Sequence, residues 1–159
     1  MKIQENILIH QDSGVLHIGI NRPEKKNALT HLMYSAMATA LKDSASDDSI
    51  NVVLIHGTDD AFSAGNDLND FNNRDVNKAS PASILLYELH NYPKPIVGAV
   101  SGVAVGIGVT MLLHFDLVYA SETYFKMPFV DLGVCPEGGS SLLIPQLAGH
   151  RKAAEILML

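Results

Sequence analysis

The sequence predicts an α/β domain built around a mostly parallel β-sheet. Two uncharged runs, residues 52–55 and 96–100, have the continuous apolar character of strands that are covered on both faces. Stretches with the apolar spacing of amphipathic helices lie between and around them, such as the one that follows Thr30. Strands that alternate with helices favour parallel βαβ connections. The 159 residues, of which 47% are apolar and 18% charged, suit a single globular domain.

Local signals place each element in order along the chain. A turn at residues 11–14 separates the first two strands, and Thr30 has the side chain of a helix N-cap. Pro93 and Pro95 end the second helix. The predicted strands cover residues 3–10, 15–21, 52–55, 96–100, 116–121 and 124–127. The predicted helices cover residues 30–47, 84–92, 106–114, 140–147 and 151–159, and residues 70–80 are expected to form a mobile surface segment.

Composition and charge argue against several classes of function. The formal net charge is −6, and no basic cluster is larger than Lys25-Lys26, which disfavours binding of nucleic acid. The spacing of the seven histidines does not suggest a zinc site. Cys135 is the only cysteine, so an intrachain disulfide is excluded and a reducing compartment is expected. The first residues have no apolar leader, so we expect a cytoplasmic protein.

The uncharged run over residues 96–113 is long enough to be considered as a membrane span. Its glycines even have the four-residue spacing of packed membrane helices. However, several glycines and a serine within the run weaken a helix, and Asp116 follows closely. A buried strand, a turn and a helix explain the run better, so we expect no membrane partner.

Two glycine-containing segments, residues 62–68 and 102–108, each follow an apolar strand. Glycine at such a junction can leave backbone N–H groups pointing into a cleft. Two N–H groups that converge on one point form an oxyanion hole, which stabilises negative charge on a carbonyl oxygen. Glu137, in an otherwise acid-poor stretch, is a candidate base. The glycines could equally serve tight turns and close packing, and Glu137 could be an ordinary acid at a helix start.

These segments resemble those of the crotonase, or enoyl-CoA hydratase/isomerase, superfamily. The matching stretches, which follow the order and spacing of that family, are residues 21–29, 62–68, 95–121 and 128–139. The resemblance implies the ClpP/crotonase fold of repeated ββα units and an acyl-CoA thioester substrate. It implies no metal and no separate cofactor, because CoA is part of the substrate. The resemblance further implies that the full-length protein is a homo-oligomer, a trimer or hexamer, with a role in fatty acid metabolism.

The resemblance also implies that further helices follow the core in a complete member. The last predicted helix, 151–159, has no glycine cap and no polar stop. We therefore expect residues 1–159 to be a crotonase-like core domain that is truncated at its C-terminal end, with the C-terminal helices missing. Such a piece is expected to be poorly active and to associate differently from a complete member.

Functional residues are carried over by position. The backbone N–H groups of Ala64 and Ile107 would form the oxyanion hole, and Glu137 would be the catalytic acid and base. The residues expected to bind the CoA ester are Lys25, Asn27, Leu29, Ala64, Gly65, Asn66, Asp67, Leu68, Gly106 and Pro136. Asp67 could instead be structural, Lys25 could be a solvated charge, and Cys135 is expected to be a small core residue.

The two glutamates of a hydratase would fall at Thr110 and Phe129, and neither residue can transfer a proton usefully. Glu137 stands where the Δ3,Δ2-enoyl-CoA isomerase branch keeps its single glutamate. The resemblance thus implies that 3-enoyl-CoA is isomerised to 2-enoyl-CoA by proton transfer from C2 to C4 through an enolate. A buried glutamate should have a raised pKa, which suits this role. The alternatives are another crotonase-type reaction (hydratase, thioesterase or decarboxylase) and an acyl-CoA-binding paralogue without activity.

Overall fold

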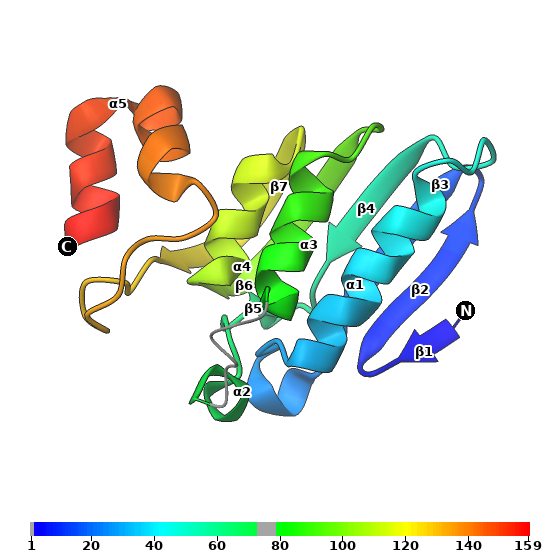
Figure 1. The fold of residues 1–159 in the computed structure, drawn as a ribbon, viewed down its shortest axis with the longest axis horizontal. Coiled ribbons are helices and arrows are strands. Elements are labelled where there is room, and N and C mark those ends of the chain that lie inside the picture. The colour runs from blue at the N-terminus through cyan, green and yellow to red at the C-terminus, as the bar shows by residue number, and fades with distance from the viewer. Residues whose placement is uncertain (1, 73–78) are drawn as a thin grey trace.

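A twisted, mostly parallel sheet forms the centre of the molecule. The computed structural model describes residues 2–72 and 79–159 (Figure 1). Within them, a seven-stranded sheet has the order β1-β2-β3-β4-β6-β5, and β7 pairs with β6. Its strands are β1 Lys2–Gln4, β2 Ile7–Asp12, β3 Val15–Ile20, β4 Val52–His56, β5 Ala61–Ser63, β6 Ile96–Val105 and β7 Leu117–Lys126. The pairs β1–β2 and β2–β3 are antiparallel and the remaining pairs are parallel, so the predicted α/β architecture is confirmed.

Helices cover one face of this sheet. In Figure 1, α1 and α3 run across the face and pack against each other, while α5 lies at the end of the molecule away from β1. The helices are α1 His31–Ser44, α2 Leu68–Asn72, α3 Pro81–His90, α4 Ile107–Thr110 and α5 Ser140–Met158. Short 3-10 helices cover Pro23–Lys25 and Met111–His114.

The N-terminal elements largely follow the local signals. Thr30 caps α1, because its hydroxyl accepts a hydrogen bond of 3.2 Å from the amide of Met33. The predicted strand 3–10 is wrong as a single element, because Glu5 and Asn6 have positive φ angles of 50° and 66° and split it into β1 and β2. The second helix begins earlier than expected, at Pro81, because Ser80 caps it.

The central strands are longer than predicted. β6 continues to Val105, and the two short strands predicted over 116–127 are one strand, β7. β7 pairs with β6 along almost its whole length, which keeps it extended across the polar residues in its middle. The predicted helix 106–114 is the short α4 followed by a 3-10 helix.

The final helix has a kink at Gly149, which agrees with the two helices predicted there. Of the segment expected to be mobile, residues 73–78 lie outside the described part of the chain, and α2 takes up its beginning.

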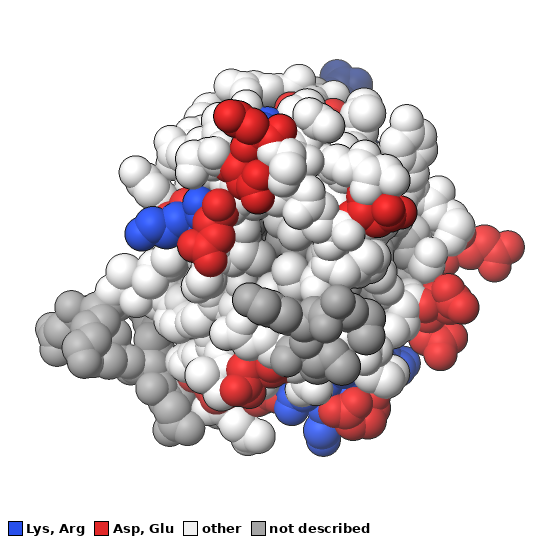
Figure 2. Space-filling model, turned by 90° about the vertical axis from the view of Figure 1, so that its right-hand side faces the viewer, with Lys and Arg blue, Asp and Glu red and all other residues white. Residues whose placement is uncertain are grey.

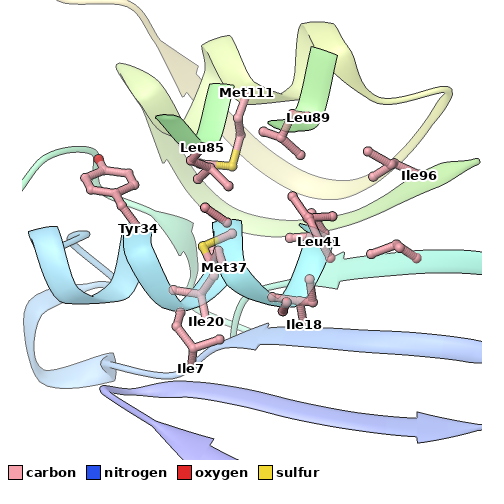
Figure 3. Close-up of a cluster of buried hydrophobic side chains, with 14 of the residues drawn as sticks. Ile7, Ile18, Ile20, Tyr34, Met37, Leu41, Leu85, Leu89, Ile96 and Met111 are labelled. Carbon is pink, nitrogen blue, oxygen red and sulfur yellow. The ribbon is translucent and has the colours of Figure 1, made fainter. Parts of the chain in front are cut away.

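The main core lies between the sheet and the helices α1 and α3 (Figure 3). Apolar side chains from both layers meet there. Those labelled in Figure 3 are Ile7, Ile18, Ile20, Tyr34, Met37, Leu41, Leu85, Leu89, Ile96 and Met111. This packing holds the start of α1 against the loops at one end of the sheet, where the candidate site lies.

The run over residues 96–113 forms β6, α4 and a 3-10 helix, so the expected strand, turn and helix are confirmed. Among the described residues, no helix is long and apolar enough to cross a membrane. Figure 2 shows acidic side chains scattered over one face of the molecule, without a concentration of basic ones.

Candidate active site

The two glycine-containing segments come together in space at one end of β5 and β6. Gly65, with φ 95°, is so close to β6 that an added Cβ would lie 3.0 Å from the carbonyl oxygen of Val105. Gly108 is even closer to β5, because an added Cβ would lie 2.7 Å from the carbonyl oxygen of Ser63. The turn after β5 and the start of α4 are therefore in direct contact, as an oxyanion hole requires.

The backbone N–H of Ala64 is not free to bind a ligand. It donates a hydrogen bond of 2.9 Å to the carbonyl oxygen of Lys26, in the loop that precedes α1. The N–H of the next residue, Gly65, donates to the hydroxyl of Ser63 at 3.1 Å. The prediction that Ala64 supplies an oxyanion-hole N–H is therefore wrong, because this group already has an acceptor inside the protein.

The backbone N–H of Asn66, unlike that of Ala64, is free to bind a ligand. Asn66 forms an isolated parallel bridge with Leu29, in which Leu29 donates to Gly65 at 2.8 Å and Asp67 donates to Leu29 at 2.9 Å. In such a bridge the N–H of the central residue faces away from the partner strand. Within the described part of the chain, the N–H of Asn66 has no acceptor. A free amide thus lies two residues beyond the predicted position.

The second predicted amide, that of Ile107, has no acceptor among residues 2–72 and 79–159. Ile107 is the first residue of α4 and follows Gly106, whose backbone (φ 55°, ψ −118°) makes the sharp turn out of β6. The N–H of Gly106 is bonded to the carbonyl oxygen of Lys126 at 2.9 Å, which holds this turn against β7. The oxyanion role of Ile107 stays a prediction, but its amide is free to take it.

The side chain of Glu137 is mostly buried and not directed into solvent. The hydroxyl of Thr110, on α4, donates a long hydrogen bond of 3.4 Å to Glu137 Oε1. Burial raises the pKa of Glu137, and the bond from Thr110 opposes this rise. The direction agrees with the sequence-based expectation.

Backbone contacts hold Glu137 in place. Its carbonyl oxygen accepts bonds from the amide and the hydroxyl of Ser140 at 3.0 and 2.6 Å, at the start of α5. The neighbouring carbonyl of Gly138 accepts a bond of 2.9 Å from His114 Nε2. Gly138 has φ 61°, and an added Cβ there would lie 3.0 Å from Thr110 Cβ. The acid is therefore tied to the same short helix that carries Ile107 and Thr110.

Glu137 and Asn66 both line a cavity of about 50 Å³. Its lining residues come from four separate parts of the chain: Leu29, His31, Asn66, Asp70, Ser80, Ala82 and Glu137. The side chain of Asp70 is fixed at its edge, because it accepts a bond of 2.7 Å from the amide of His31. His31 and Asp70 carry no recognisable signal for this location in the sequence.

Two of the residues expected to bind substrate have structural roles. Asn27 is 0% exposed. Its Nδ2 donates to the carbonyl oxygen of Ala61 at 2.6 Å and its Oδ1 accepts from the amide of Arg22 at 2.7 Å. The prediction that Asn27 contacts the ligand is wrong, because its side chain links the loop before α1 to β5.

Asp67 forms an ion pair of 2.7 Å with Arg22, and hydrogen bonding to this guanidinium lowers the pKa of Asp67. Because the N–H of Asp67 also has an acceptor in Leu29, the structural alternative is favoured for this residue.

Of the other predicted binding residues, Leu29 lines the cavity, and no contact tests the role of the rest. Lys25 and Leu68 are exposed, whereas Leu29 and Gly65 are buried; Gly106 and Pro136 lie between these extremes. Cys135 is free and exposed, so the expectation of a small core residue is wrong.

Thr110 and Phe129, at the positions of the two hydratase glutamates, are both buried. Phe129 packs in a small apolar cluster with Met127 and Ile144. Among the described residues, no group of three potential ligands could hold a metal ion. Glu137 and Asp70 are the acidic residues that line the cavity with Asn66, and Asp70 is already bound to the amide of His31.

Comparisons with known proteins identify the family of the chain. Residues 10–159 match the family model described as Enoyl-CoA hydratase/isomerase. The chain is 42% identical to Enoyl-CoA delta isomerase 2 of Rattus norvegicus over 167 residues, which cover 99% of this chain and 42% of the rat protein. It is 39% identical to Enoyl-CoA delta isomerase 3, peroxisomal, of Mus musculus over 164 residues, which cover 97% of this chain and 51% of the mouse protein.

Among solved structures, an enoyl-CoA hydratase/isomerase from Pseudoalteromonas atlantica T6c superposes with a TM-score of 0.92 at 41% identity. The match covers 97% of this chain and 62% of that one. This chain spans about half the length of the two mammalian relatives, or less. On its sequence, its site and its fold, it belongs to the enoyl-CoA hydratase/isomerase family and has the crotonase fold.

Proposed function

We propose that this chain is the core of an enoyl-CoA isomerase that moves a C3–C4 double bond of an acyl-CoA thioester to C2–C3. The observation that carries the proposal is the shared cavity of Glu137 and Asn66. Support also comes from Thr110 and Phe129, which stand where a hydratase would need its two glutamates. The two-glutamate mechanism of hydration therefore lacks both of its proton-transferring groups in this chain. Isomerisation needs only one such group, and Glu137 can supply it.

In the proposed reaction, the N–H groups of Asn66 and Ile107 bind the thioester oxygen. The Glu137 carboxylate removes a proton from C2, and the electrons move into the conjugated enolate. When the enolate collapses, the C2–C3 double bond forms and C4 takes a proton back from the Glu137 carboxyl group. Each amide that binds the developing oxyanion is worth about 3–4 kcal/mol of transition-state stabilisation.

The surroundings of Glu137 suit a group that must both take and return a proton. Burial raises its pKa, which makes the carboxylate a stronger base. The Thr110 hydroxyl partly offsets this effect and fixes the orientation of Oε1. The same carboxyl group can therefore serve C2 and C4 on one face of the substrate.

The test is Glu137→Gln in the complete protein, assayed with 3-enoyl-CoA. Because the amide cannot take a proton, turnover should fall by at least about 1,000-fold, while binding of a saturated CoA ester stays within about twofold. Glu122→Gln, at an exposed position on β7, is the matched control and should keep full activity.

Three results would argue against isomerisation. A Gln variant that retains activity would remove Glu137 from the mechanism. Hydration, hydrolysis or decarboxylation by the wild-type protein in place of double-bond movement would indicate another crotonase-type reaction. Tight binding of CoA esters without any turnover would indicate a silent paralogue.

Several properties of the whole protein belong to the same proposal. We propose a homo-oligomer, a trimer or hexamer, in the cytoplasm, with a role in fatty acid metabolism and no cofactor besides the CoA of the substrate. The exposed Lys25, near the loop that bridges to Asn66, would face the phosphates of CoA. Sedimentation of the complete protein measures the oligomeric state directly.

A further inference from the structure

Tyr34 connects the main core to the candidate site. It lies in the first turns of α1 and is 1% exposed. Figure 3 shows its ring at the edge of the core cluster, with the hydroxyl oxygen directed away from the other labelled side chains. That hydroxyl donates a hydrogen bond of 2.7 Å to Asn66 Oδ1. A buried tyrosine hydroxyl needs a partner, and here the partner is the residue with the free amide.

Two sets of contacts therefore hold Asn66. The bridge to Leu29 holds its backbone, and Tyr34 holds its side chain. Tyr34 does not line the cavity that Asn66 shares with Glu137. It can influence a ligand there through Asn66, without touching it.

The charge surroundings keep Tyr34 a hydrogen-bond donor. Burial raises its pKa well above the usual value, and the nearby carboxyl groups of Glu137 and Asp70 raise it further. The phenol therefore stays protonated at any pH at which the site would work, and the bond to Asn66 Oδ1 is maintained.

We propose that Tyr34 is a positioning residue that directs the backbone N–H of Asn66 toward the thioester oxygen of the substrate. This inference rests on the proposed function, because it assumes that a CoA thioester occupies the cavity. A hydrogen bond to a developing oxyanion weakens steeply when its angle closes. The peptide unit that carries the Asn66 N–H is held at one point, the Gly65 carbonyl oxygen that accepts from Leu29, so without the Tyr34 bond it can tilt about that contact and the N–H loses its alignment.

The first experiment is Tyr34→Phe in the complete protein, a change that removes the hydroxyl and keeps the ring. We expect kcat to fall about tenfold, with KM changed less than about twofold, because the lost alignment matters most in the transition state. Tyr92→Phe is the matched control, since Tyr92 makes a 2.7 Å bond of the same kind to Ser44, away from the site. It should leave kcat unchanged.

The second experiment does not depend on isomerisation. Infrared difference spectra of butanoyl-CoA labelled with ¹³C at the thioester carbonyl report how strongly the protein polarises that bond. We expect a shift to lower frequency with the wild-type protein and with Tyr92→Phe, and a clearly smaller shift with Tyr34→Phe. Should wild type show the shift and Tyr34→Phe a smaller one while 3-enoyl-CoA is not turned over, the isomerase proposal fails and the role of Tyr34 stands. An equal shift in all three proteins, or none in wild type, overturns the role of Tyr34.

A double-mutant cycle with Asn66→Ala tests the route of the effect. Asn66→Ala keeps the backbone N–H but removes the carboxamide that Tyr34 holds, so it should reproduce the loss in kcat and in the infrared shift. In the Asn66→Ala protein, adding Tyr34→Phe should lower kcat by a further factor of less than about two. Losses that multiply would show that Tyr34 acts elsewhere. If Tyr34→Phe does not fold, as judged by circular dichroism, the infrared shift of Asn66→Ala decides: a wild-type shift overturns the proposal.

Discussion

At Glu137, two neighbouring influences act on one carboxyl group in opposite directions. Burial favours the protonated acid, while the Thr110 hydroxyl donates to Oε1 and so favours the carboxylate. Thr110 is itself 0% exposed, so water cannot readily replace it as the donor. Thr110 thus lowers the basicity of Glu137 through its hydrogen bond, although Thr110 cannot usefully transfer a proton itself.

Replacing Thr110 by valine, which has nearly the same shape, should move the acid limb of the pH–rate profile to higher pH. Without the hydroxyl the pKa of Glu137 rises further, and the base must be ionised to take the C2 proton. We expect kcat/KM to fall further below that of wild type as the pH is lowered through the acid limb, and to stay within about twofold of wild type at pH 9. Thr123→Val is the control, because Thr123 bonds to the Val100 carbonyl, away from the site. A limb that stays in place or moves to lower pH contradicts the assigned role of Thr110.

At the scale of elements, β6 organises the site because it changes partners along its length. Its first half pairs with β4 and its second half with β5, while β7 runs along its other edge. Gly102 lies where the pairing of β6 changes from β4 to β5. Its φ angle is 68°, and the pairing of β6 with β7 has a register shift there. An added Cβ at Gly102 would overlap the carbonyl group of Asp60. A glycine is therefore needed for β5 to approach and for α4 to follow in contact with it.

Gly102→Ala and Gly149→Ala separate the two reasons for a glycine. Both residues have positive φ, 68° and 77°, but Gly149 has no atom within 4 Å of an added Cβ. Gly149→Ala should lower the free energy of unfolding by about 2 kcal/mol, the cost of a backbone conformation (φ 77°, ψ 161°) that is almost exclusive to glycine. Gly102→Ala should lower it by about 3 kcal/mol or more, because the backbone must also move. Urea denaturation of the complete protein measures both, and equal losses would show that the close approach to Asp60 is not important.

At the scale of the molecule, the two ends of the sheet differ in how completely they are covered. The core under α1 and α3 is closed, whereas β7 and α5 carry exposed large apolar side chains, among them Tyr124 at 61% and Leu147 at 73%. A cavity of about 630 Å³ lies between β7, α4 and α5, lined mainly by apolar residues. Apolar surface of this extent is typical of a face that other protein surface covers.

The 159-residue chain by itself should therefore associate with itself at increasing concentration. Sedimentation velocity should show species larger than a monomer in the micromolar range. A Phe125→Ser, Leu147→Ser double variant should weaken the association, because both residues line the open cavity. Ser13→Ala, in an exposed turn at the other end of the sheet, serves as the control and should associate like wild type. A chain that stays monomeric would show that the apolar surface of β7 and α5 does not drive association.

Much of the fold follows from local patterns. Apolar runs identified β4 and β6, and the Thr30 cap identified the start of α1. The two helices predicted over 140–147 and 151–159 leave a gap where α5 has its kink. The motif around Glu137 pointed to the acid, which the structure places in the cavity with Asn66. These features depend on neighbours within a few positions, so a sequence pattern is enough to predict them.

Other features depend on contacts between distant parts of the chain. The assignment of the free amide to Asn66 and not Ala64 depends on acceptors at Lys26 and Leu29. The burial of Asn27 depends on β5, and the role inferred for Tyr34 depends on where α1 packs. Sequence alone determined the family and the order of the main elements, and it pointed to Glu137. Only the tertiary structure decided which backbone N–H remains free, because that depends on which distant carbonyl groups the folded chain brings within hydrogen-bond range.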